Sequence, residues 1–105
     1  MSNITGTVRA RATIEAASTP VIYNVDVTNA DTEVSQALSS RTKMFTIKVR
    51  GIAKLKLAFE AGQSGITYLT VNPGNSYTAE GLDFSGELYF QTSQPGQVVE
   101  ILEWT

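Results

Sequence analysis

Residues Ile66–Trp104 read ITYLTVNPGNSYTAEGLDFSGELYFQTSQPGQVVEILEW and decide the fold class. Three runs, ITYLTV, ELYFQT and VVEILEW, are rich in β-branched and aromatic residues, and they alternate with NPGNS, AEGLDFSG and SQPG. Such side chains favour a pleated, half-buried surface, and Pro-Gly pairs mark turns. The stretch therefore predicts strands joined by turns, and nothing in it is typical of an active site.

Alternation with a period of two residues extends this pattern toward the N-terminus. It predicts further strands at Thr5–Glu15, Val21–Thr28, Lys43–Arg50 and Ala53–Phe59. The side chains expected to face inward from the last two are Phe45, Ile47, Val49, Leu55, Leu57 and Phe59. These two strands are expected to form a hairpin through Gly51-Ile52, so that their outward lysines and Arg50 make one basic stripe.

The C-terminal half is expected to contain strands at Ile66–Val71, Ser76–Thr78, Glu87–Thr92 and Val98–Trp104. Asn72-Pro73-Gly74-Asn75 has Pro and Gly where a type II turn requires them. The segment from Ala79 to Gly86 is expected to be a longer connection. Thr32–Leu38 is ambiguous, because its apolar spacing mildly favours a short helix.

About eight short strands without βαβ alternation predict an all-β fold, a small antiparallel β-sandwich or jelly roll. At 105 residues, with no linker or long repeat, the chain is expected to form a single domain over residues 1–105.

The absence of Cys and His excludes several chemistries. Disulfides and Ser-His-Asp or Cys-His nucleophiles are impossible, and zinc or copper sites are disfavoured. Asp26, Asp31 and Glu33 are oxygen ligands of the kind calcium takes, but their spacing is not that of an EF-hand, and solvated turn residues are the simpler interpretation. We therefore expect no enzyme activity, no cofactor and no metal.

The charges divide the chain into a basic and an acidic part. Six of the eight basic residues lie from Arg41 to Lys56, and none follows Lys56. One interpretation is cross-strand ion pairing within the fold. The other is contact with neighbouring copies or a partner, for which the candidates are Arg41, Lys43, Lys48 and Arg50. A net charge of -2 argues against a nucleic-acid partner.

The last predicted strand has two apolar faces. Val99, Ile101 and Glu103 point one way, whereas Val98, Glu100, Leu102 and Trp104 point the other. Either the strand is central and covered on both faces, or Leu102 and Trp104 pack on a neighbouring subunit. The low charged fraction of 17% also has two explanations. Either the surface is rich in Ser, Thr, Asn and Gln, or much of it is covered by other chains.

The N-terminus lacks the apolar core of a secretory signal, and no apolar run is long enough to span a membrane. We therefore expect synthesis and folding in a cytoplasm and no membrane partner.

From Arg41 to Trp104 the sequence resembles small virion proteins of tailed bacteriophages. The resemblance is in TKMFTIKVRG, KLKLAFEAGQSG, ITYLTVNPGNSY and ELYFQTSQPGQVVEILEW. It implies a β-sandwich or jelly roll of the capsid decoration (cement) or head-fibre type and a strand at Thr32–Leu38. The partners that it implies are other copies of the chain and the major capsid protein or another virion protein. It also implies a virion location, after assembly in the bacterial host cytoplasm.

Two other functions are weighed against capsid decoration. The nearer is a tail accessory protein, and the more distant is a sugar-binding module for host attachment. An exposed cluster of Trp or Tyr with Asp or Asn would favour sugar binding, whereas apolar residues buried only in an oligomer would favour decoration.

Overall fold

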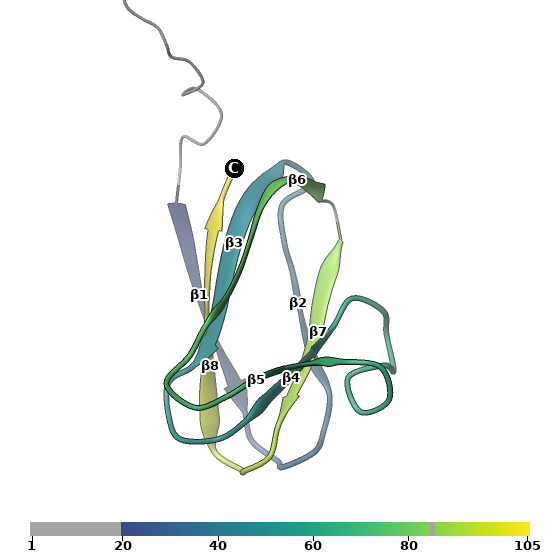
Figure 1. The fold of residues 1–105 in the computed structure, drawn as a ribbon, viewed down its shortest axis with the longest axis vertical. Helices are drawn as coiled ribbons and strands as arrows, with labels where there is room; N and C mark the ends of the chain where they lie inside the picture. Colours follow the sequence, from purple (N-terminus) through teal and green to yellow (C-terminus); the bar gives the residue numbers. More distant parts are fainter. Residues whose placement is uncertain (1–19, 85) are drawn as a thin grey trace, which may run out of the picture.

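The structure is a computed structural model that describes residues 20–84 and 86–105. All regular structure in this part of the chain is β-strand (Figure 1). The strands are β1 (Pro20–Val27), β2 (Val34–Ala37), β3 (Thr42–Val49), β4 (Leu55–Ala58), β5 (Leu69–Val71), β6 (Tyr77–Phe84), β7 (Glu87–Thr92) and β8 (Gln97–Trp104). The predicted strand Thr5–Glu15 lies outside the described residues.

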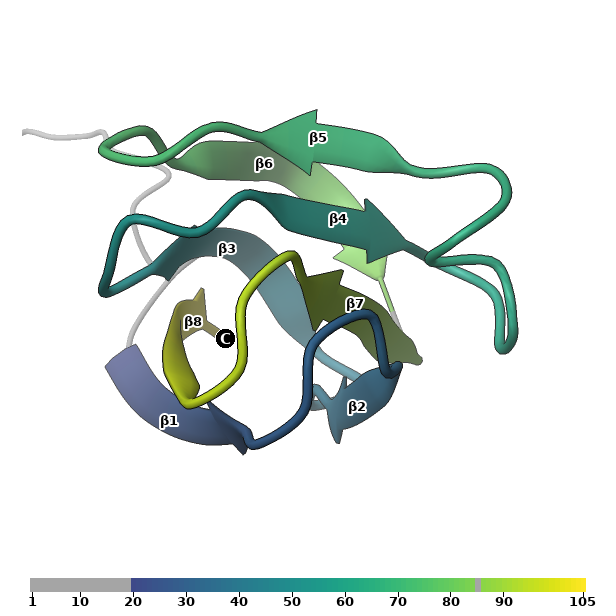
Figure 2. The ribbon, with the colours of Figure 1, turned by 90° about the horizontal axis from the view of Figure 1, so that it is seen from below.

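Two four-stranded antiparallel sheets face each other (Figures 1 and 2). One sheet has the order β1-β8-β3-β6, and the other has the order β2-β7-β4-β5. This interleaving, in which the first strand pairs with the last and the second with the seventh, is that of a jelly roll. The predicted all-β sandwich of about eight strands is confirmed.

The core lies between the sheets and is built from the inward positions of each strand. Phe45, Ile47 and Val49 in β3 are buried, as the alternation predicts, and Val27 in β1 is buried with them. The other buried members of the core cluster are Leu38, Ala53, Leu55, Leu57, Val71, Leu88, Phe90, Val99 and Ile101. Because each strand contributes every second residue, neither sheet can slip by one residue without exposing its apolar set.

Several local predictions are also confirmed. The turn at Asn72–Asn75 has Gly74 at φ 84° and a hydrogen bond from the Asn75 amide to the Asn72 carbonyl of 3.0 Å, as a type II turn requires. The segment 32–38 contains the strand β2, which agrees with the family resemblance and not with the helical spacing. The predicted strand Glu87–Thr92 matches β7.

The predicted hairpin through Gly51-Ile52 is wrong. β3 pairs with β6 and β8, whereas β4 pairs with β5 and β7 in the opposite sheet. The connection therefore crosses from one sheet to the other, and Lys48 and Lys54 do not share a basic stripe. Crossing lets Leu55 and Leu57 pack face to face with β3 instead of beside it.

Three strand boundaries also differ from the prediction. β5 begins only at Leu69, because residues 64–66 form a turn with hydrogen bonds back to Gln63. β6 is longer than predicted and runs to Phe84, where a connection was expected. Phe59, predicted to face the core, follows the end of β4 and is 48% exposed. In the described part of the chain, no helix has the length and apolar character needed to cross a membrane.

Candidate functional site

Three exposed large side chains of β5 and the β4–β5 connection, Phe59, Tyr68 and Leu69, border one groove. Its volume is about 350 Å³, and we call it the Phe59 groove. Its lining residues are Leu57, Ala58, Phe59, Glu60, Gln63, Thr67, Tyr68 and Leu69. Phe59 is 48% exposed, Tyr68 41% and Leu69 43%, and the neighbouring Ile66 is 71% exposed. The groove thus presents apolar surface with a polar margin.

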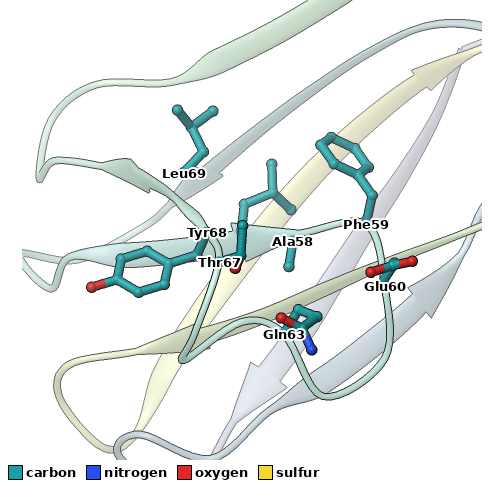
Figure 3. A pocket seen from close by; sticks show the side chains of 8 residues that line it. Ala58, Phe59, Glu60, Gln63, Thr67, Tyr68 and Leu69 are labelled. Carbon is teal, nitrogen blue, oxygen red and sulfur yellow. The ribbon is translucent and has the colours of Figure 1, made fainter.

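Local geometry explains why these side chains are uncovered. Leu69 lies opposite Leu57 in the β4–β5 pair and shares its face with buried Val71, so it points toward the interior from the edge of its sheet. Phe59 extends to the same side as Leu69 from the end of β4, whereas Tyr68 extends away (Figure 3). Phe59 is held against the core by Phe45, with ring centroids 6.4 Å apart. The groove is therefore an open side of the sandwich.

A clamp formed by Glu33 fixes the loop beside the groove. Its carboxylate accepts hydrogen bonds from the Gly62 amide at 2.8 Å, the Ser64 amide at 3.0 Å and the Ser64 hydroxyl at 2.5 Å. The Ser64 hydroxyl also lies 3.1 Å from Oε1 of Gln91 in β7. The hydrogen bond from Ser64, followed by that from the Gly62 amide, lowers the pKa of Glu33. These contacts attach the loop after β4 to the sheet that contains β4, through Glu33 before β2 and Gln91 in β7.

The clamp gives Glu33, one of the three possible calcium ligands in the sequence, hydrogen-bond partners within the protein. Glu33 is directed at the loop 60–65, and no three carboxylates of the described residues gather in a possible metal site. Asp31, at φ 53°, uses its amide to bond the Thr92 carbonyl at 2.8 Å. Asp26, Asp31 and Glu33 therefore do not form one cluster of possible ligands among the described residues.

The predicted contact residues lie on or next to the sheet β1-β8-β3-β6. Lys48 and Arg50 both reach Glu100 of β8, with Nζ–Oε1 at 3.7 Å and Nε–Oε2 at 2.8 Å. The Arg50 hydrogen bond is the main reason why the pKa of Glu100 is lowered. For these two residues the structure has the cross-strand ion pairs that one interpretation expected, and their contact with a partner stays a prediction.

The other four predicted contact residues are spread along the same sheet. Arg41 is exposed in the turn before β3, and Lys43 is half-buried within β3. Leu102 and Trp104 are half-buried on the outer face of β8, opposite Thr46 and Met44 of β3. Next to Leu102, a shallow hollow of about 280 Å³ is bordered by Ile22, which is 68% exposed. β8 is central in its sheet, yet its outer face is only partly covered by the described residues.

One buried charged residue was not recognised as a structural centre from the sequence. Glu103, 1% exposed, faces the core from β8. It accepts hydrogen bonds from the Tyr23 hydroxyl at 2.7 Å, from the Ser39 amide at 2.6 Å and from the Thr42 hydroxyl. The hydrogen bond to Glu103 raises the pKa of Tyr23 to about 12. The only sequence signal was its place on the same face of the last predicted strand as Val99 and Ile101.

The Phe59 groove was missed for a related reason. Phe59 was assigned to the core because it continues the alternation of Leu55 and Leu57, and Ile66–Tyr68 were assigned to a strand because of their composition. Neither pattern predicts that β4 ends at Ala58, directly before Phe59, or that β5 begins only at Leu69. No local signal distinguishes an inward side chain that is covered from one at an open edge.

The comparisons with known proteins name no family for the chain. No protein-family model matches it, and no curated protein matches it. Among solved structures, the chain is similar to the solution NMR structure of a de novo designed double-stranded β-helix, with 19% identity and a TM-score of 0.49. The match covers 84% of this chain and 100% of that chain.

Proposed function

We propose that the protein is a structural virion protein of a tailed bacteriophage, a capsid decoration subunit that self-associates and bridges neighbouring capsid subunits. In this role it needs no catalysis, cofactor or metal, and it contacts neither nucleic acid nor membrane. The motif resemblance from Arg41 to Trp104 supports this proposal. The jelly roll is compatible with it, since viral capsid proteins use this fold, but lectins and cupins use it too.

The observation that supports self-association is the Phe59 groove. Phe59 and Leu69 extend to the same side and are 48% and 43% exposed, and Tyr68, which is 41% exposed, also borders the groove but extends away from them. Contiguous apolar patches with a polar margin mark protein interaction sites. Aromatic residues are enriched in interface cores, and Lys56 orients Tyr68 with its Nζ 4.8 Å from the ring centroid. The Glu33 clamp would keep this surface preformed, which lowers the entropic cost of association.

Mass measurement in solution tests self-association. Sedimentation equilibrium of the full chain at micromolar concentration is expected to give an oligomer. Leu69→Glu places a charge in the groove and should shift the mass toward the monomer. Ile52→Glu is the matched control, because Ile52 is 85% exposed and borders a different hollow, and it should leave the mass unchanged. Thermal unfolding of both variants verifies that each one folds.

Capsid binding tests the virion role. The full chain is mixed with capsids of the encoding phage assembled without it, and co-sedimentation is measured. Saturable binding that Leu69→Glu weakens and Ile52→Glu does not would support decoration. A chain that is monomeric and does not bind capsids would overturn the proposal, and retention of such a monomer on a carbohydrate array would favour sugar binding instead.

A further inference from the structure

β1 differs from the other three edge strands of the described sandwich. β2 has four residues and β5 has three, and β6 contains a register shift against β3 and carries the exposed Glu80. Short length, bulges and charges are the usual ways by which proteins prevent a sheet edge from pairing. β1 has eight residues in unbroken register with β8, and its only charged residue is Asp26.

The exposed side chains of β1 also indicate a missing neighbour. Val21 is 37% exposed although it belongs to the inward set of Tyr23, Val25 and Val27. Ile22, on the outward set, is 68% exposed. A further strand along the free edge would cover both residues and would pair the backbone groups that point away from β8.

The sequence directly before β1 has the matching pattern. The alternating segment Thr5–Glu15 lies outside the described residues and ends five positions before Pro20. Val8, Ala10, Ala12 and Ile14 form its apolar set, and Thr7, Arg9, Arg11, Thr13 and Glu15 form its polar set. Residues directly opposite each other in a sheet share a face, so the apolar set must lie opposite the inward set of β1.

Turn chemistry selects one register among those that match the faces. A two-residue hairpin loop would consist of Ser18-Thr19, but such loops need Gly or Asn at positions with positive φ. A four-residue loop at residues 16–19, most often built around a type I turn that most residues tolerate, places Glu15 opposite Pro20. In that register Ile14 lies opposite Val21, and Arg9 lies opposite Asp26, the one charge on β1. Opposite charges across a pair stabilise it.

We propose that the free edge of β1 is a docking site for residues 8–15 of the same chain, which pair with β1 as an antiparallel strand from Glu15 opposite Pro20 to Val8 opposite Val27. The sheet then has five strands, with residues 8–15 at its edge and β1 as an internal strand. This pairing closes the edge without using the Phe59 groove, so it stands or falls independently of the proposed self-association.

Cysteine pairs test the register, because the native chain has no Cys to interfere. Thr13→Cys with Ile22→Cys puts two thiols on the same face at directly opposite positions, within the Cα spacing that a disulfide needs. Ala12→Cys with Ile22→Cys is the matched control, since its thiols lie on opposite faces. Each full-length variant is equilibrated in a glutathione redox buffer at low concentration, and free thiols and mass are then measured.

The first variant is expected to lose its free thiols as a monomer, whereas the control keeps most of them. Disulfide-linked dimers would show that another copy supplies the strand, and equal oxidation of both variants, or of neither, would show that no such register exists. Each of these results overturns the proposal. In the unmodified full chain, the β1 amides that point away from β8 should exchange slowly with solvent, and exchange at the rate of unpaired amides would contradict the docking.

Discussion

At the scale of single residues, the buried Glu103 has the largest structural consequences. A carboxylate that is 1% exposed would be costly to bury without partners, and here Tyr23, Ser39 and Thr42 supply three donors. These donors come from β1, from the turn after β2 and from β3. One side chain therefore joins the first strand to the last and to the connection between the two sheets.

Removing one of these donors should be costly. We expect Tyr23→Phe to lower the free energy of unfolding by about 2 kcal/mol, as for a hydrogen bond to a charged group in a protein interior. Tyr89→Phe is the matched control: its hydroxyl donates to Glu87 at 2.8 Å within one strand, and its loss should leave the stability almost unchanged. Urea denaturation of the two variants and the native chain measures the difference. Equal effects would contradict a special role for the buried pair.

The same contact has a pH dependence in the alkaline range. Because the pKa of Tyr23 is about 12 in the folded chain and 10.0 is its ordinary value, the unfolded chain loses this proton first. The stabilisation is therefore complete below pH 10 and is lost as the pH rises toward 12. The difference between the native chain and Tyr23→Phe should accordingly shrink between pH 10 and pH 12.

At the scale of elements, the loop between β4 and β5 is ordered by a contact outside itself. Its residues 60–65 include two glycines, and its amides at Gly62 and Ser64 are held by Glu33, which lies just before β2. β2 in turn pairs with β7, to which Ser64 is also linked through Gln91. The clamp thus connects an edge strand, a central strand and the border of the Phe59 groove.

We expect Glu33→Gln to accelerate amide hydrogen exchange at Gly62 and Ser64 several-fold while β3 and β8 stay protected. The lowered pKa of Glu33 fixes the sign of the pH effect, since the carboxylate form binds the two amides. The clamp stabilises the fold above the ordinary value of 4.5 and weakens as the pH falls below it. The difference between the variant and the native chain should therefore decrease in acid.

Glu60→Gln is the control for this experiment, because Glu60 is exposed in the same loop and the clamp does not use its side chain. If the two variants exchange alike at Gly62 and Ser64, the clamp does not order the loop.

At the scale of the whole molecule, the fold depends on pairing between the ends of the described chain. β8 lies between β1 and β3 and pairs along its length with both. The β1–β8 pairs are 70 to 84 positions apart and the β3–β8 pairs are 50 to 60 positions apart. Such distant contacts make folding slow compared with helical proteins of this size.

A chain that ends at Gly96 should therefore fail to fold. It lacks β8, which leaves β1 without a described partner and removes Val99 and Ile101 from the core. We expect it to show no cooperative unfolding transition by circular dichroism. Removal of Thr105 alone is the control and should preserve the transition. A cooperative transition in the shorter chain would show that the two sheets do not depend on the central strand.

The sequence by itself determined what depends on neighbouring residues. Alternation identified the inward set of β3 and separated the two faces of β8, and Pro73-Gly74 identified the turn before β6, because strand faces and turn dihedrals are properties of consecutive residues. The all-β class followed from the same patterns.

Only the tertiary structure decided which strands pair and which inward side chains are covered. The sequence at Gly51-Ile52 predicts a hairpin, but this connection crosses from one sheet to the other. Glu103 and Glu33 have hydrogen-bond partners that are distant in the sequence. Leu57 and Leu69 have similar local patterns, yet one is 1% and the other 43% exposed. The physical reason is that burial depends on what lies opposite a residue across the sandwich, and in a jelly roll that neighbour comes from a distant part of the sequence.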